Sequence, residues 1–177
     1  MQKNAKSRFT VRDIAYIGMY LALFYVLDVI SNMVPLFKMP QGGTLGLGTV
    51  ALLLASYHLG WKKGLLTAML SVLIQFVSGQ MYLLGFVQFL LDYFIAFSVY
   101  GIACLFPNFG YFYSGILITN LIRFISSTIS GIVFYEVPFW GSVVYQASYL
   151  VPTLILDLIL VPLLVKGLGP VFRRKHS

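Results

Sequence analysis

Long apolar runs alternate along the chain with short stretches rich in polar residues, glycine or proline. Six runs are predicted to be helices: 14–34, 45–59, 65–77, 86–106, 111–134 and 142–165. About 20 apolar residues cross the hydrocarbon core of a bilayer, so the two short runs, the second and the third, would tilt little or be partly re-entrant. The pattern predicts an all-α integral membrane protein, a bundle of six transmembrane helices.

The composition supports this prediction. Of the 177 residues, 59% are hydrophobic and only 10% are charged, so six spans leave no room for a soluble domain. We expect one transmembrane domain, with spans within 14–165 and basic cytoplasmic tails at 1–12 and 166–177. The only cysteine is Cys104, which excludes a disulfide framework and any multi-cysteine metal or redox site.

The distribution of the +7 net charge indicates membrane topology, and we expect no nucleic-acid partner. Six spans put both termini on one side. Lys38 falls on the other side and Arg123 within the fifth run. The remaining ten of the twelve cations share the side of the termini: Lys3, Lys6, Arg8, Arg12, Lys62, Lys63, Lys166, Arg173, Arg174 and Lys175. The positive-inside rule makes that side cytoplasmic, in a bacterial plasma membrane, whereas five or seven spans would misplace one basic terminus.

A single carboxylate, Asp92, lies near the middle of the apolar stretch 86–97. An ionisable group at a helix centre costs about 2.5–3.5 kcal/mol on insertion scales and rarely faces lipid. Asp92 is therefore expected to face protein, an aqueous cavity or a ligand, and we favour a cationic ligand. The alternative is an ion pair with Arg123 of the fifth run, and the two arrangements are compatible at a cavity wall.

Polar residues recur at helical spacing in four runs, which places each set on one helix face. The sets are Ser71, Gln75 and Ser78; Gln88 and Asp92; Asn120, Arg123, Ser127, Ser130 and Gly131; and Gln146, Tyr149, Thr153 and Asp157. Converging faces would line an outward-open cavity, ringed by the aromatic residues Tyr82, Tyr93, Tyr135, Trp140, Tyr145 and Tyr149.

A few polar groups among aromatic rings are typical of a small-molecule pocket, and such rings can hold a flat cation. The alternative is that Ser and Thr bond only to their own helices while Tyr and Trp anchor at the membrane interface. Asp28 and Asp157 lie nearer the ends of their runs, and we expect mainly structural roles for them.

Enzymatic chemistry is not predicted. His58 falls in the basic loop between the second and third runs and His176 in the tail, so no histidine is expected inside the membrane for base or metal chemistry. The glycines at 42–48 match neither a phosphate loop nor a dinucleotide motif. We expect no metal and no cofactor.

The first run carries a small-xxx-small motif, Gly18 and Ala22. Such a face lets a second helix approach closely. The partner is either another helix of this chain or a separate membrane subunit.

Taken together, four segments resemble the thiamine-specific substrate-binding subunits of energy-coupling factor (ECF) transporters. They are 39–44 (MPQGGT) before the second run, 87–93 (VQFLLDY), 123–124 (RF) with 129–134 (ISGIVF), and 145–152 (YQASYLVP). The similarity extends over most of the chain. It implies a six-helix fold with an outward-facing pocket capped by the loop after the first run. It further implies docking on a transmembrane coupling subunit with two cytosolic ATPases.

The resemblance also implies roles for single residues. Asp92 and Tyr93 match the acid–tyrosine pair that binds the thiamine cation, while Arg123 and Gly131 match pocket positions. Gly18 and Ala22 match the motif that docks the coupling subunit. This chain departs from the family at four pocket positions, where a histidine, an asparagine, a tryptophan and a tyrosine are replaced by Ser127, Gln146, Tyr135 and Gly141, respectively.

We therefore predict a substrate-capture subunit that binds thiamine or a close relative. Beyond Asp92 and Tyr93, the predicted ligand contacts are Tyr82, Gln88, Arg123, Ser127, Gly131, Tyr135, Trp140 and Gln146. The first alternative is a self-sufficient carrier driven by an ion gradient, with Asp92 as the titrating group. A membrane enzyme or a purely structural subunit is the second.

Overall fold

The computed structural model describes residues 9–35, 39, 43–79 and 81–169. The six basic residues predicted in the outermost tails, together with Lys38, lie outside this part of the chain, as do residues 40–42 of the motif at 39–44. The helices are α1 (Val11–Met33), α2 (Leu47–Leu59), α3 (Trp61–Val77), α4 (Phe86–Phe89), η2 (Leu90–Ile95), α5 (Ala96–Ser98), η3 (Val99–Leu105), α6 (Ser114–Phe134) and α7 (Phe139–Gly167). A short hairpin of β1 (Asn108–Phe109) and β2 (Phe112–Tyr113) precedes α6.

Each of the six predicted runs is largely helical, so the fold is mostly helical as predicted, apart from the short hairpin at the start of the fifth run. Within the described residues, four helical segments are long and apolar enough to cross a membrane: Val11–Met33, Phe86–Leu105, Ser114–Phe134 and Phe139–Gly167. α2 is apolar but has only 13 residues, and α3 has 17. Six crossings and cytoplasmic termini therefore stay predictions.

The predicted loop between the second and third runs is wrong. α2 continues through His58 to Leu59, and α3 begins at Trp61, so Gly60 alone separates them. Gly60 has a φ of 80°, a backbone conformation open to glycine at no steric cost. His58 is buried in the last turn of α2, and its Nδ1 lies 2.8 Å from the Tyr20 hydroxyl oxygen.

Lys63 of this corner forms an ion pair with the first turn of α1. The Lys63 Nζ lies 2.6 Å from the Asp13 carboxylate, and Thr10 and Asp13 form a reciprocal capping box at the first turn of α1. The α2–α3 corner and the start of α1 therefore belong to the same end of the molecule. The end of α7 lies at the hairpin, since Lys166 lies over the ring of Tyr111 in the β1–β2 turn.

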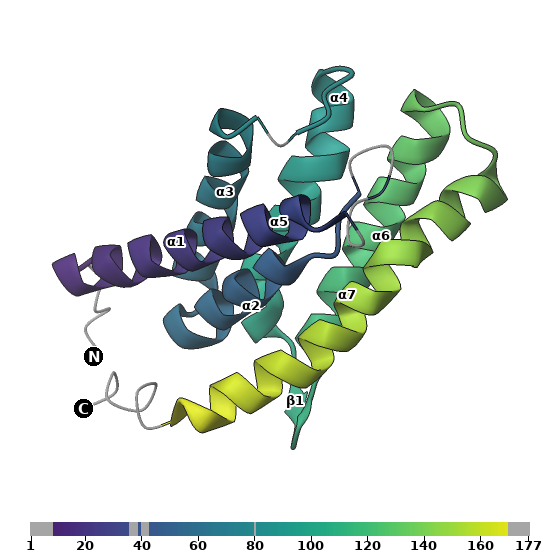
Figure 1. Ribbon diagram of the computed structural model, residues 1–177. Coiled ribbons are helices and arrows are strands. Elements are labelled where there is room, and N and C mark those ends of the chain that lie inside the picture. Colours follow the sequence, from purple (N-terminus) through teal and green to yellow (C-terminus); the bar gives the residue numbers. More distant parts are fainter. Residues whose placement is uncertain (1–8, 36–38, 40–42, 80, 170–177) are drawn as a thin grey trace, which may run out of the picture.

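Figure 1 shows the two ends of the bundle clearly. The start of α1 lies at the left, the α2–α3 corner and the end of α7 lie at the lower left and the hairpin at the bottom, whereas the α3–α4 and α6–α7 connectors lie at the top. Among the described cations, Arg12, Lys62, Lys63 and Lys166 belong to the first end. This arrangement agrees with the topology that the charge distribution predicts.

α2 is the centre of the fold. Eleven of its 13 residues are buried, and it contacts α1, α3, α7 and η3. A helix that is apolar on all sides is stable only when other elements surround it. The longer helices instead expose large apolar side chains on their outer faces, for example Val26, Leu121 and Ile155, as expected of surfaces that meet lipid.

α2, α3 and η3 pack with their backbones almost in contact. A Cβ atom added to Gly64 of α3 would lie 2.6 Å from the Gly101 carbonyl oxygen and 2.7 Å from Ser56 Cα. Ser56 holds the same junction, since its hydroxyl donates to the Gly101 carbonyl at 2.8 Å and accepts from the Cys104 N–H at 3.1 Å. Any side chain at Gly64 must push backbone segments apart.

We predict that Gly64→Ala destabilises the protein by about 1–3 kcal/mol through overpacking. Gly18→Ala is the control, because no atom lies within 4 Å of a Cβ added there. Since alanine is favoured over glycine in helices by up to about 1 kcal/mol, the control should melt at or above the wild-type temperature. Thermal unfolding in detergent checks both, and equal melting temperatures of the two variants would contradict the packing described.

Candidate functional site

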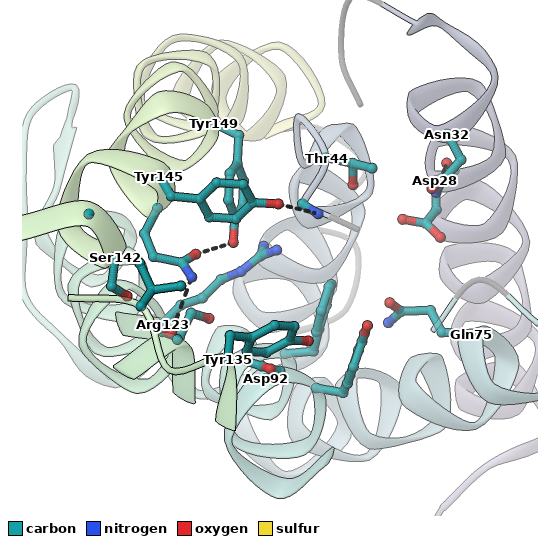
Figure 2. A pocket seen from close by; sticks show the side chains of 18 residues that line it. Asp28, Asn32, Thr44, Gln75, Asp92, Arg123, Tyr135, Ser142, Tyr145 and Tyr149 are labelled. Atoms are coloured by element: carbon teal, nitrogen blue, oxygen red, sulfur yellow. Dashed lines mark hydrogen bonds between the residues drawn. The ribbon is translucent and has the colours of Figure 1, made fainter. Parts of the chain in front are cut away.

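A cavity of about 340 Å³ lies among the helices, a volume within the range of small-molecule pockets. It is lined from six directions: Asp28 and Asn32 of α1; Gly43 and Thr44 before α2; Gln75 of α3; Asp92, Tyr93 and Phe97 of η2 and α5; Arg123, Ser127 and Gly131 of α6, followed by Tyr135 and Val137; and Gly141, Ser142, Tyr145, Gln146 and Tyr149 of α7. The four predicted polar faces thus converge, and Figure 2 shows their polar groups turned towards a common space.

The wall that carries Asp92 and Tyr93 is a π-helix, Leu90–Ile95, inserted between the α-helical turns of α4 and α5. A π-helical turn is wider than an α-helical turn, is rare, and occurs frequently at functional sites. The hydroxyl of Ser126 on α6 donates to the Leu91 carbonyl oxygen at 2.7 Å. α6 thereby stabilises the irregular segment, as polar partners must do where backbone groups are shielded from water.

Asp92 is held by neutral hydrogen-bond donors. Its Oδ2 accepts from Gln88 Nε2 and from Ser130 Oγ, each at 2.7 Å. The predicted alternative, an ion pair with Arg123, is wrong for this structure, since among the described residues the only ion pair within 4 Å is that of Lys63 with Asp13. The negative charge of Asp92 is therefore not cancelled by a direct cation contact.

Gln88 does not line the cavity but connects its parts. It is fully buried, and its Nε2 lies within hydrogen-bonding distance of the Tyr82 carbonyl oxygen (3.1 Å) and the Tyr135 hydroxyl oxygen (3.3 Å), besides Asp92. Its Oε1 accepts from the Leu84 N–H at 3.1 Å. The connector before α4, the carboxylate and the end of α6 are thus joined by one amide.

Two predicted aromatic contacts lie outside the cavity. Tyr82 is 51% exposed and stacks on Tyr135 with ring centroids 6.0 Å apart, while its N–H donates to the Tyr93 hydroxyl at 2.7 Å. Trp140 is 74% exposed and packs against Phe139. Tyr82 thus supports lining residues from behind, whereas Trp140 is in the first turn of α7, which begins three residues earlier than predicted, and it does not line the cavity.

Arg123 lies against aromatic rings. Its guanidinium carbon is 4.5 Å from the centroid of Phe97 and 5.9 Å from that of Tyr100, and Nη1 donates to the Tyr100 hydroxyl at 3.4 Å. Such contacts stabilise a desolvated guanidinium through the negative faces of the rings. Its Nε is buried and has no protein partner among the described residues.

Below Arg123, a buried polar network joins four elements. Tyr100 donates to Asn120 Oδ1 at 2.8 Å, Asn120 Nδ2 donates to Asp157 Oδ2 at 3.1 Å, and Thr49 Oγ1 donates to Asp157 Oδ1 at 2.9 Å. Asp157 is fully buried outside the cavity. Its position agrees with the structural role expected from the sequence.

α7 closes the cavity opposite α3. The amide of Gln146 donates to the Ser127 carbonyl oxygen at 3.1 Å and accepts a short hydrogen bond from Tyr149. These bonds join two of the positions at which the chain departs from the family, Ser127 and Gln146. Tyr135 lines the same cavity; burial, followed by the charge of Asp92, raises the pKa of its phenol above the ordinary value. It therefore stays neutral at physiological pH.

The sequence did not predict that α1 contributes a wall of the cavity. Asp28 was expected to be structural, yet it lines the cavity together with Asn32 and Gln75, across from Asp92. The available signal was the spacing of Asp28 and Asn32, four apart on the first run, a polar pair on one helix face. Within the described part of the chain, no three His, Cys, Asp or Glu side chains gather closely enough to hold a metal ion.

A second candidate site, apart from the cavity, is the row of small residues on the outer face of α1. Ala15, Gly18 and Ala22 are exposed on its outer face, and a Cβ added to Gly18 would meet no atom within 4 Å. Packing of this motif against another helix of the same chain is therefore wrong for the described residues, and the small face is open to an external partner.

Comparisons with known proteins show which proteins this chain is similar to. A sequence model of the thiamine transporter protein family matches residues 14–173. The thiamine transporter ThiT of Bacillus subtilis (strain 168) is 32% identical over 169 residues, covering 84% of this chain and 87% of that protein. A solved structure of ThiT from Listeria monocytogenes superposes with a TM-score of 0.76 at 16% identity, covering 92% of this chain and 97% of that one. The last similarity concerns the fold alone.

The two buried glutamines provide a prediction about the site's construction. Gln88→Met removes the hydrogen bonds to Asp92 and the connector and should destabilise the protein by about 1–3 kcal/mol. Gln75→Met is the matched control, since its buried Nε2 has no partner among the described residues. It should leave the melting temperature unchanged or raise it. A larger loss of thermal stability in Gln75→Met than in Gln88→Met would contradict the assignment.

Proposed function

Because the chain belongs to the thiamine transporter protein family, it is a transport protein of the membrane and not an enzyme, and we propose that it is the substrate-capture subunit of an ECF-type importer. Its cavity binds thiamine or a closely related compound. The observation that carries this proposal is the carboxylate of Asp92, which faces the cavity on a π-helix and is held by two neutral donors.

The charges that line the cavity fit a monocation. Two carboxylates, Asp28 and Asp92, face one guanidinium, Arg123, so ionised groups leave one excess negative charge. The thiazolium ring of thiamine carries one fixed positive charge. In a site shielded from water, opposite charges attract more strongly than in bulk solvent, and the excess charge therefore favours a cationic ligand over a neutral analogue.

The aromatic side chains favour a flat cation. Tyr93, next to Asp92 on the π-helix, lines the cavity together with Tyr135, Tyr145 and Tyr149. A quaternary thiazolium nitrogen has no N–H to donate, so it gains from π faces and a nearby carboxylate more than from hydrogen bonds. Ser127, Gly131 and Gln146 complete this wall with small groups and one amide.

The departures from the family lie in this wall. The Gln146 amide is already bonded to the Ser127 carbonyl oxygen and to Tyr149, and a Cβ added to Gly131 would collide with Ser142 Oγ. The side chains of this wall are thus packed and hydrogen-bonded to one another without the family's histidine, asparagine and tryptophan. We therefore expect thiamine or a close relative to bind here through contacts that differ from those of the family.

The cavity opens towards the outside. Tyr135, Val137 and Gly141 at its rim come from the α6–α7 connector, opposite the end that carries Arg12, Lys62, Lys63 and Lys166. The positive-inside rule assigns the basic end to the cytoplasm of a bacterial cell. Six crossings, including the short α2 and α3, are consistent with this placement.

Energy for transport comes from partners. In the described chain no nucleotide motif was found, and Gly18 and Ala22 present an open small face on α1. We assign this face to a transmembrane coupling subunit that carries two cytosolic ATPases. The second candidate is a self-sufficient carrier driven by an ion gradient, which the cavity carboxylates would permit.

Titration of the purified protein with thiamine tests the proposal. Asp92→Asn should weaken thiamine binding by about tenfold to a hundredfold, since interactions with a charged group are worth about 1.5–3 kcal/mol. Asparagine keeps an oxygen for Gln88 and Ser130, so the variant should stay folded. Glu136→Gln, an exposed carboxylate outside the cavity, is the matched control. Equal affinities of the two variants would remove the role of Asp92.

Replacement of Gly18 by leucine tests the docking face. Gly18→Leu should abolish co-purification with the coupling subunit and ATPases and stop uptake, while thiamine affinity stays at the wild-type value. Ser148→Leu, which enlarges an exposed small residue on α7, should retain both. Uptake by the chain alone in liposomes under an ion gradient would instead support the self-sufficient carrier.

A further inference from the structure

We propose that Asp28 and Gln75 form a second polar subsite, which binds the aminopyrimidine edge of the ligand. This inference rests on the proposed function and assigns an orientation to the ligand within the cavity. The subsite lies on the wall formed by α1 and α3, across from Asp92 and the tyrosines (Figure 2).

Asp28 belongs to the wall of the cavity, and its carboxylate has no donor among the described residues. The residue is only 7% exposed, although it lies in the interior of α1 and faces the cavity. The hydrogen bond that the Asn32 side chain donates to it, from Nδ2 at 2.9 Å, goes to the Asp28 backbone carbonyl oxygen and not to the carboxylate. A carboxylate of a largely buried residue in a membrane helix is costly without a donor, and so the side chain is expected to meet a donor that arrives in the cavity.

Gln75 provides an independent observation. It is 5% exposed, its Nε2 is buried without a partner among the described residues, and its amide points into the same cavity. Buried polar groups in native proteins are almost always satisfied, and each exception calls for a physical reason. A ligand acceptor would supply the missing partner.

The two side chains together define the chemistry of the ligand edge. Asp28 offers an acceptor, and Gln75 offers a donor from the same wall. The complement is an edge with an amino group next to an unprotonated ring nitrogen, which is what an aminopyrimidine presents. The thiazolium ring has no N–H group and cannot satisfy Asp28 in this way. It is therefore placed against Asp92 and the tyrosines.

Oxythiamine is the discriminating probe, because a carbonyl oxygen replaces the pyrimidine amino group while the thiazolium ring is unchanged. A site built to accept from an amino group rejects an analogue that lacks it, since the buried acceptor is left unpaired. Wild-type protein should therefore bind thiamine more than tenfold more tightly than oxythiamine.

Asp28→Asn should weaken thiamine binding tenfold or more and reduce the preference over oxythiamine, because asparagine can also donate to the carbonyl oxygen. Gln75→Met should likewise weaken thiamine binding and narrow the preference, without lowering the melting temperature of the ligand-free protein. A purely structural glutamine would change the melting temperature and leave the preference as it was. Glu136→Gln is again the control and should match wild type in both.

The outcomes separate this inference from the proposed function. Wild-type protein that binds no thiamine would overturn the proposed function. Tight thiamine binding by the wild type, with an unchanged preference over oxythiamine in both variants, would overturn the subsite alone. A loss of affinity for the two ligands in equal proportion would also overturn it, and Gln75→Met decides the matter if Asp28→Asn does not fold.

Discussion

A half-buried carboxylate in a membrane helix must be stabilised, and under the proposed function it must also keep its negative charge. Asp92 meets this constraint through two neutral donors, Gln88 and Ser130, both at 2.7 Å. Pairing with Arg123 would have neutralised the charge and left the cavity with little reason to attract a cation. The π-helical turn and the fully buried glutamine behind it place the carboxylate at the cavity wall.

Arg123 is kept in place by a separate set of contacts. It lies over Phe97 and donates to Tyr100, and Tyr100 continues through Asn120 to the buried Asp157. This network ties α6, η3 and α7 to the central helix α2, where Thr49 donates to the same carboxylate. The scaffold thus holds two opposite charges near one cavity without joining them, and the packing around α2 gives it rigidity.

Much of this architecture could be predicted from the sequence, and the reasons are physical. Polar residues three or four apart in an apolar run rarely face lipid and therefore face the interior of the bundle. The inward orientation of Arg123, Ser127 and Gly131 was predictable for this reason. An orientation of Gly18 and Ala22 towards a separate subunit was one of the two predicted alternatives for α1. Family motifs then pointed to thiamine, which the comparisons support.

What could not be predicted depends on tertiary packing and local backbone geometry. A π-helix has no clear sequence signal, so an ordinary helix was expected at Asp92. Asp28 lies nearer the end of its run, a position that many carboxylates occupy without lining a site, and only the packing of α1 against α3 brings it to the cavity. Trp140 was misjudged because the start of α7, which sets its direction, depends on the preceding connector.

Anomalous scattering from the thiazolium sulfur in crystals of the thiamine complex locates the cationic ring directly. If Asp92 receives the cation, a sulfur peak that belongs to no methionine or cysteine will lie inside the cavity, on the side of Asp92, Tyr93 and Tyr135. A peak outside the cavity, or one beside Asp28 and Gln75 with the pyrimidine ring against Asp92, would contradict this binding mode.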